Sequence, residues 1–315
     1  MTGAELFIIV KEWLSVVRLA LELVLRGVRR RPEDWELRLQ DFFPAQDSIR
    51  LHGLPRNEPQ IKIEGKVDNL SQTQIAYAEE QRIQIEKNRR DGKLPSSNDP
   101  HAILIEEPSW GENPVTFKVR TLEYAEVLAL KNADPQKVPR RISANALMIC
   151  RKTKEVILHE RDVRSETFGG FLHTPGGSFM PPGYGPIDDD HRLSRTVRRE
   201  VLEELSGSIN LDENPPMLLM EEVQTGFVQL TFLGVNISAA ENKNLRANLE
   251  GRVCRIKFSE LKDKLVMPVS WVSTGKAAVL AWLALGAPNA GFFRKFAEYK
   301  AADLFDLVVP RRTSR

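Results

Sequence analysis

Residue types that mark several classes of protein are scarce in this chain. Its 315 residues include two cysteines and five histidines, too few and too scattered for a zinc cluster or a disulfide framework. Because Cys150 and Cys254 lie far apart in the sequence, a reducing cytoplasm fits best as the location. The net charge of +2 at pH 7 is too small by itself to indicate nucleic acid, so no nucleic-acid partner is expected.

A long uncharged hydrophobic run is also lacking. Residues 4–30 are rich in Leu, Val, Ile and Trp, but charged residues recur among them at helical spacing and form one polar stripe. This pattern predicts an amphipathic helix over residues 1–31 rather than a membrane span or a secretory signal. Two roles are open for this helix. It packs against the protein's own core or a second copy, which would form a homodimer, or residues 4–30 contact a membrane surface.

What the chain does contain is typical of a soluble globular protein, with 42% hydrophobic and 28% charged residues. Periodicity and turn residues divide it into the helix 1–31, a smaller α+β region over 32–140, a main domain over 141–290, and a C-terminal helix and tail over 291–315. Strands are predicted over residues 61–67, 101–105, 115–120, 146–150, 156–158, 217–223, 227–237 and 252–258, and further helices over 71–90, 122–132, 276–285 and 292–307.

The most informative stretch is residues 199–204, which read Arg-Glu-Val-Leu-Glu-Glu. Aliphatic residues recur every four positions from 193 to 205, so the segment is predicted to be one helix with a buried face. Glu200, Glu203 and Glu204 then fall within an arc of roughly 100° beside that face. Because massed like charges cost free energy, the cluster indicates a hard divalent cation with oxygen ligands, and Mg²⁺ first of all.

The flanks of this helix form a recognisable unit. Upstream, residues 173–177 read His-Thr-Pro-Gly-Gly, and the glycine pair allows a tight turn with an accessible backbone. Residues 181–186 have the composition of a loop, and three aspartates at 188–190 are predicted to supply the helix N-cap and first-turn acids. Residues 206–207, Ser-Gly, end the helix. The expected order is strand, glycine loop, acidic helix and turn.

This unit resembles the signature of the Nudix hydrolases, in which a glycine loop precedes a helix reading R-E-U-x-E-E, with U aliphatic. Arg199, Glu200, Val201, Glu203 and Glu204 match that helix residue by residue. The resemblance extends over residues 142–285. It implies an α/β fold, namely an α/β/α sandwich with a mixed sheet, preceded here by the smaller α+β region.

The first half of the signature departs from the family. Gly177 matches the motif glycine only if the loop carries an insertion, whereas an ungapped alignment puts Gly185 there and His191 at the first glutamate. On either alignment that glutamate is missing, and Ser206 replaces the final glycine. The metal-binding half is therefore intact and the substrate loop is unusual. Whether the altered half reduces activity is left open.

The resemblance implies cleavage of a diphosphate bond in a nucleoside diphosphate linked to another group, with Mg²⁺, or Mn²⁺ in its place. It assigns the metal to Glu200, Glu203, Glu204 and the carbonyl of Gly177, the catalytic water to Glu200 or Glu204, and an ion pair that fixes a glutamate to Arg199. Relatives take a general base from a later loop. Glu250 is the candidate here, with Glu221 and Glu222 as alternatives.

Substrate contacts are predicted from residue type and position. Arg161 and Arg164 follow a predicted strand and suit phosphate oxygens, while His173 and Tyr184 lie around the glycine loop and suit stacking on a base. The layout before the main domain is weakly similar to that of uridine diphosphate glucose pyrophosphatases, which points to a nucleotide sugar. The alternative of another class is a Nudix-fold sensor or scaffold that binds a nucleotide without cutting it.

Overall fold

The computed structural model describes residues 49–66, 70–93, 97–112, 114–165, 168–182, 191–211, 215–246, 248, 251–266 and 271–284. The described residues belong almost entirely to one compact unit, which spans residues 43–282. The predicted helices 1–31 and 292–307 lie outside the described residues. No helix in the described ranges is long and apolar enough to cross a membrane.

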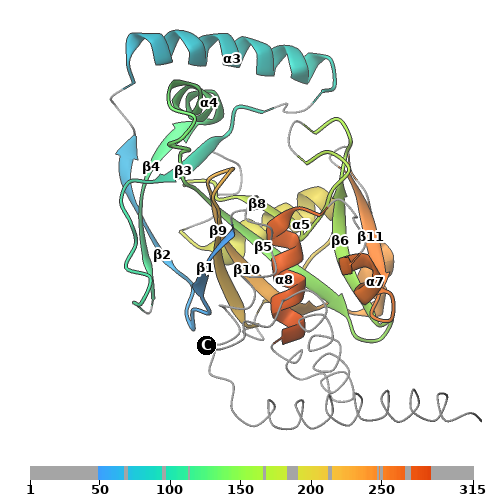
Figure 1. The fold of residues 1–315 in the computed structure, drawn as a ribbon. Helices are drawn as coiled ribbons and strands as arrows, with labels where there is room; N and C mark the ends of the chain where they lie inside the picture. Colours follow the sequence, from blue (N-terminus) through green and yellow to red (C-terminus); the bar gives the residue numbers. More distant parts are fainter. Residues whose placement is uncertain are drawn as a thin grey trace, which may run out of the picture. The chain divides into compact units, whose positions relative to one another are not determined.

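One mixed sheet of eleven strands dominates the described part of the chain (Figure 1). Its strands are β1 (Ile49–Gly53), β2 (Gln60–Lys66), β3 (Pro100–Leu104), β4 (Thr116–Glu123), β5 (Arg141–Cys150), β6 (Glu155–Arg161), β7 (Leu172–His173), β8 (Gly176–Ser178), β9 (Met217–Glu222), β10 (Phe227–Asn236) and β11 (Gly251–Lys257). The fold is mixed α/β, which confirms the predicted class.

Strand β5 is the hub of this sheet. The main path runs β1-β9-β10-β5-β3-β4-β2, and β6 and β8 also pair with β5. β10 runs parallel to β5, whereas β3, β6 and β8 run antiparallel to it. β3 joins β5 where Ile103 pairs with Arg141, and the N–H of Leu104 donates to the carbonyl of Arg140 over 2.8 Å. The sheet therefore continues across the boundary predicted at residue 140.

The helices of the described residues are α3 (Gln72–Arg90), α4 (Tyr124–Ala133), α5 (Leu193–Leu205), α6 (Ala239–Asn244), α7 (Leu261–Val266) and α8 (Ser273–Ala284). Ser71 caps the N-terminus of α3. Its hydroxyl accepts from the N–H of Gln74, and the Gln74 side chain accepts from the N–H of Ser71. α3 and α4 lie together beside β3 and β4 (Figure 1) and bury small apolar side chains between them.

Helix α5 packs against β5 and β8 through the predicted aliphatic face. Leu193, Val197, Val201 and Leu205 are fully buried in the main core. The predicted capping by the aspartates at 188–190 is wrong. The helix is preceded by Arg192, whose side chain makes no capping bond, and its first turn carries no acid.

Candidate active site

The glycine turn before α5 brings backbone and carboxylate together. Gly176 and Gly177 pair with Asn145 and Ala144 of β5. A Cβ on Gly176 would collide with β5, and a Cβ on Gly177 would lie within 2.5 Å of the Oε1 atom of Glu200. Because both positions lack a side chain, β8 can pair closely with β5, and the Glu200 carboxylate can contact the Gly177 backbone.

Arg199 ties the helix to that turn. Its Nη1 donates to Oε1 of Glu200 over 2.7 Å and to Oε2 of Glu203 over 3.2 Å, and its Nη2 donates to the carbonyl of Ser178 over 2.9 Å. The guanidinium is buried, so these charge-assisted bonds are shielded from water. Arg199 therefore bridges two glutamates and anchors both to β8.

Burial governs the protonation of Glu200. Burial raises the pKa of its carboxyl to about 8, and the neighbouring charges of Glu204 and Glu203 act in the same direction, against the lowering effect of Arg199. In the absence of a cation the carboxyl therefore holds a proton at neutral pH. A divalent cation would replace that proton, and the oxygen donors beside Gly177 fit Mg²⁺ or Mn²⁺.

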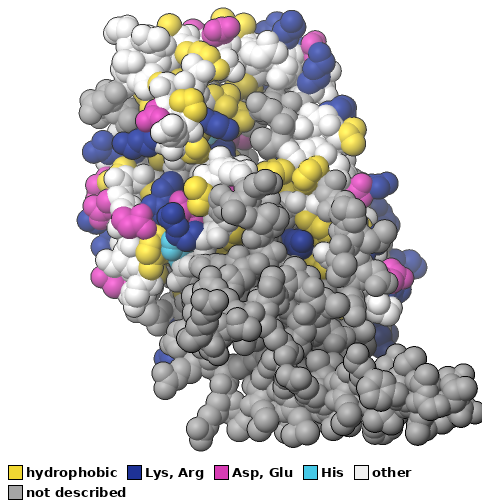
Figure 2. Space-filling model, viewed as in Figure 1, with side chains coloured by type: hydrophobic (Ala, Val, Ile, Leu, Met, Phe, Trp, Pro, Cys, Tyr) yellow, Lys and Arg dark blue, Asp and Glu magenta, His cyan; other side chains and the backbone are white. Residues whose placement is uncertain are grey.

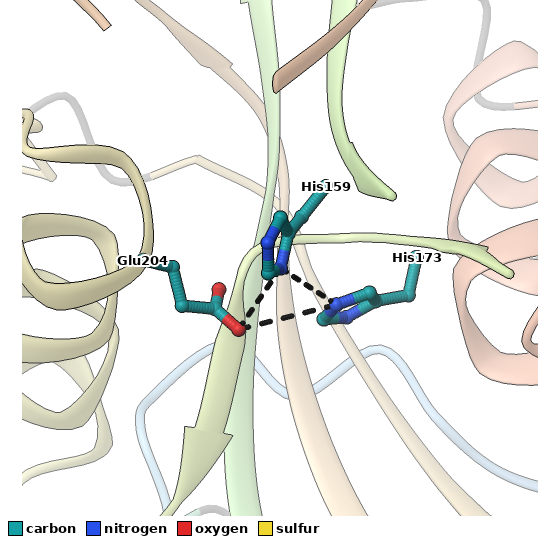
Figure 3. Close-up of side chains that lie close together, drawn as sticks. All are labelled: His159, His173 and Glu204. Carbon is teal, nitrogen blue, oxygen red and sulfur yellow. Dashed lines mark hydrogen bonds and ion pairs between the residues drawn. The ribbon is translucent and has the colours of Figure 1, made fainter. Parts of the chain in front are cut away.

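Glu204 faces two histidines instead (Figure 3). Its Oε1 lies 3.2 Å from Nδ1 of His159 and 3.9 Å from Nε2 of His173, and its Oε2 accepts the N–H of Gly176 over 3.0 Å. Burial would raise the pKa of Glu204, but the hydrogen bond with His159 and the contacts with His173 and Gly176 outweigh it and lower the pKa. Burial lowers the pKa of His173 to about 3, so its ring is neutral.

A cavity of about 450 Å³ opens beside these groups. Glu200, Glu203 and Glu204 contribute to its wall, together with the glycine turn and Arg199. Glu203 is 56% exposed on its side chain, while the other two glutamates are largely buried. The acidic cluster therefore borders a cavity that is partly open to solvent.

Two parallel core strands line this cavity with polar residues. Arg141, Ser143 and Asn145 of β5 alternate with apolar residues, and the first two pair in register with Phe227 and Gln229 of β10. Ser143 Oγ and Asn145 Oδ1 are buried without a hydrogen-bond partner among the described residues. Because buried polar atoms are normally paired, both atoms are candidates for contact with a bound molecule.

The region before residue 140 supplies another part of the wall. His101 of β3 and Tyr124, Leu128 and Lys131 of α4 all line the cavity. The rings of His101 and Tyr124 lie 5.5 Å apart at their centroids. None of these residues was predicted to belong to the site, because sequence periodicity does not show which distant segments meet.

The predicted substrate residues are distributed unevenly. Arg161 and His173 line the cavity, as does Glu222, one of the alternative bases. Arg164 instead pairs with Asp162 over 2.7 Å and does not line the described cavity.

The other alternative base, Glu221, faces away from the cavity lining and bonds to Arg140 and His52. Tyr184 and the preferred base Glu250 lie outside the described residues, so their roles stay predictions. His159 was not predicted at all. The only signal for it in the sequence is a histidine at the end of an aliphatic strand.

Figure 2 shows how charged side chains lie on one face of the molecule. On the described part of the face in Figure 2, basic and acidic side chains are interspersed. The expectation that no nucleic acid binds stays a prediction.

Three solved structures show what the fold is similar to. A MutT protein from Methanosarcina mazei Go1 matches with a TM-score of 0.31 and 21% identity, over 51% of this chain and 93% of its own. A second match is a bifunctional NMN adenylyltransferase/ADP ribose pyrophosphatase from Francisella tularensis, complexed with AMP and a Mn ion. Its TM-score is 0.36 and its identity 15%, over 51% of this chain and 45% of its own. Shewanella oneidensis NrtR, complexed with a 27mer DNA, matches with a TM-score of 0.28 and 16% identity, over 55% of this chain and 78% of its own.

A NUDIX hydrolase from Nitrosomonas europaea, which bears the name of the family that the signature of α5 resembles, matches with a TM-score of 0.23 and 12% identity, over 39% of this chain and 69% of its own. At such low identities and TM-scores the likeness concerns the fold alone. No protein-family model and no curated protein matches the sequence.

Proposed function

We propose that this protein hydrolyses the diphosphate bond of a nucleoside diphosphate linked to another group, with Mg²⁺ as its cofactor and Mn²⁺ as a substitute. One observation carries the proposal. The carboxylates of α5 converge on a cavity beside a glycine turn, with Glu200 and Glu204 largely buried. Buried carboxylates of this density need a cation to offset their charge, and a diphosphate needs the same cation.

Each part of the wall has a defined task in this proposal. Glu200, Glu203 and the Gly177 carbonyl hold the cation, and Glu200 or Glu204 orients the attacking water. A bound divalent cation neutralises phosphate oxygens and lowers the pKa of bound water. Arg161 lies on the cavity wall, where a guanidinium suits the phosphate oxygens.

A nucleotide sugar is the proposed substrate class. The aromatic rings of Tyr124 and Phe168 belong to the cavity lining, and such rings stack on bases. The unpaired polar atoms of Ser143 and Asn145 suit the hydroxyl groups of a sugar. Both features extend the site beyond what a bare diphosphate requires.

Incubation with Mg²⁺ and a panel of nucleotide sugars, dinucleotides and nucleoside triphosphates, followed by ³¹P NMR, tests the proposal. We expect one class to be cleaved, and Glu204→Gln to lower the rate about 1,000-fold, within the range for loss of a group that assists proton transfer. Glu80→Gln, which changes an exposed carboxylate on α3, should not alter it. Tight nucleotide binding without any product would support the sensor alternative and overturn the enzyme.

A further inference from the structure

Three side chains from separate elements meet behind the acidic helix. His159 comes from β6, His173 from β7 and Glu204 from α5, and all three are at least 95% buried. The atoms that face one another are Nδ1 of His159, Nε2 of His173 and Oε1 of Glu204 (Figure 3). His173 and Glu204 also line the cavity, which gives a small ion a route to them.

The separations of these atoms match the dimensions of a metal site. They are 3.0 Å between the two nitrogens, and 3.2 Å and 3.9 Å from Glu204 Oε1 to His159 and His173. A triangle with these sides has a circumscribed circle of radius about 2.0 Å, which is the length of a Zn–N or Zn–O bond. One ion at the centre of that circle therefore reaches all three atoms, and a shortening of the longest separation, between Glu204 and His173, would bring the arrangement toward the tetrahedral geometry of Zn²⁺.

The hydrogen-bond geometry of the cluster also suits a cation. Gly176 donates its N–H to the second carboxylate oxygen of Glu204 over 3.0 Å, which fixes the orientation of the group. Nδ1 of His159 carries at most one proton, yet Nε2 of His173 and Oε1 of Glu204 both lie within 3.2 Å of it. One proton therefore cannot satisfy both contacts fully, whereas an ion between the three atoms contacts all of them.

We propose that His159, His173 and Glu204 form a binding site for a first-row transition-metal ion of the Zn²⁺ type. Mg²⁺ prefers six oxygen ligands, whereas two imidazoles and one carboxylate favour Zn²⁺, Co²⁺ or Fe²⁺. The site is distinct from the proposed Mg²⁺ site at Glu200 and Glu203, although Glu204 borders both. It deepens the proposed function, because it places a second ion on the same cavity.

Titration of the metal-free protein with Co²⁺, followed by visible absorption, tests this site without any substrate. We expect one equivalent to bind with d–d bands, Zn²⁺ to displace it, and excess Mg²⁺ to leave it in place. His159→Asn and His173→Gln keep a polar group near the original nitrogen, and each should weaken Co²⁺ binding about 100-fold or more, since even the partners of ligands are worth roughly 10–100-fold. His191→Asn, which removes a histidine outside the cluster, should change nothing.

A measurement on the unaltered protein guards against misfolded variants. Zn²⁺ should shift the imidazole ¹⁵N resonances of two of the five histidines and leave the others in place. Unchanged resonances, or Co²⁺ bands that persist in both cluster variants, would overturn the site.

The two proposals fail separately. Co²⁺ binding at the histidines without hydrolysis of any substrate keeps this site and rejects the enzyme. Mg²⁺-dependent hydrolysis without Co²⁺ binding keeps the enzyme and rejects the histidine site.

Discussion

Helices α3 and α5 both carry paired arginine and glutamate residues, and they use them differently. On α3, Arg82 pairs with Glu79 on the same helix and with Glu123 and Glu126 at the start of α4, and these side chains are 23–63% exposed. On α5, the side chain of Arg199 is 6% exposed and that of its partner Glu200 is 14% exposed. The residue types are shared, and the environment is not.

Solvent decides what each set of charges does. Water screens the pairs on α3, and exposed pairs of that kind contribute about 0–1 kcal/mol each. On α5 the same residue types lie against a glycine turn and a cavity, where an unpaired charge is costly. A string of arginines and glutamates therefore does not identify a site by itself. Its burial beside a cavity makes it a candidate site.

Replacing Arg199 on α5 and Arg82 on α3 tests this comparison, and the Arg199 variant has the largest effect on stability that we expect. Arg199→Met removes a buried guanidinium together with its bonds to Glu200, Glu203 and the carbonyl of Ser178, so the free energy of unfolding should fall by about 3 kcal/mol. Arg82→Met should lower it by less than about 1 kcal/mol, because its partners are hydrated. Urea unfolding followed by circular dichroism measures both. Equal losses would mean that burial does not distinguish the helices.

A methyl group at the glycine turn sharpens the same contrast. Gly177→Ala places a Cβ against the Glu200 carboxylate and should displace it. A misplacement of about 1 Å can cost roughly 100-fold in rate, so hydrolysis should fall by about that factor. Gly111→Ala is the matched control, since a Cβ there meets nothing within 4 Å. If the Gly177→Ala protein turned over substrate at an unchanged rate, hydrolysis would not depend on the position of the Glu200 carboxylate.

The sequence predicted α5 well because its aliphatic residues repeat at the helical period. Four of them, from Leu193 to Leu205, form the fully buried face. The capping prediction failed because aspartate at a loop end is a common N-cap, yet the helix begins at Leu193, three residues after Asp190.

Strand β5 was predicted only over residues 146–150, although it begins at Arg141. The polar residues at 141, 143 and 145 concealed its first half, because they face the cavity from a core strand. His159 and the wall from β3 and α4 were missed for a related reason. They join the site through tertiary pairing that no local pattern records.

The pH dependence of cation binding distinguishes the buried carboxylate from an exposed one. The pKa of Glu200 is raised to about 8, chiefly by burial, so the metal-free fold favours its protonated form. The stability that this group contributes is therefore fully present below its unfolded pKa of 4.5 and is lost as the pH rises from there through about 8. Below that pH, Mg²⁺ must displace a proton. Its apparent affinity should rise about tenfold per pH unit between pH 6 and pH 8 and then level off.

Calorimetric titration of Mg²⁺ at several pH values measures this slope. Glu200→Gln should abolish it. An affinity independent of pH in the unaltered protein would mean that Glu200 is already ionised. On the exposed side, the pKa of Glu123 beside Arg82 is lowered despite the opposing effect of burial, so Glu123→Gln should leave the slope unchanged.

The ends of the two helices give the smallest predicted effect. Ser206 ends α5 in the left-handed region, at φ +50°, whereas Asp91 ends α3 at φ −82°. A side chain in the left-handed region costs roughly 1–2 kcal/mol, and glycine avoids that cost but loses more chain entropy on folding. Ser206→Gly should therefore stabilise the fold by about 0.5–1 kcal/mol, and Asp91→Gly should destabilise it slightly. Thermal unfolding of both variants decides the matter, because a melting temperature for Ser206→Gly at or below that of the unaltered protein would place the strain elsewhere.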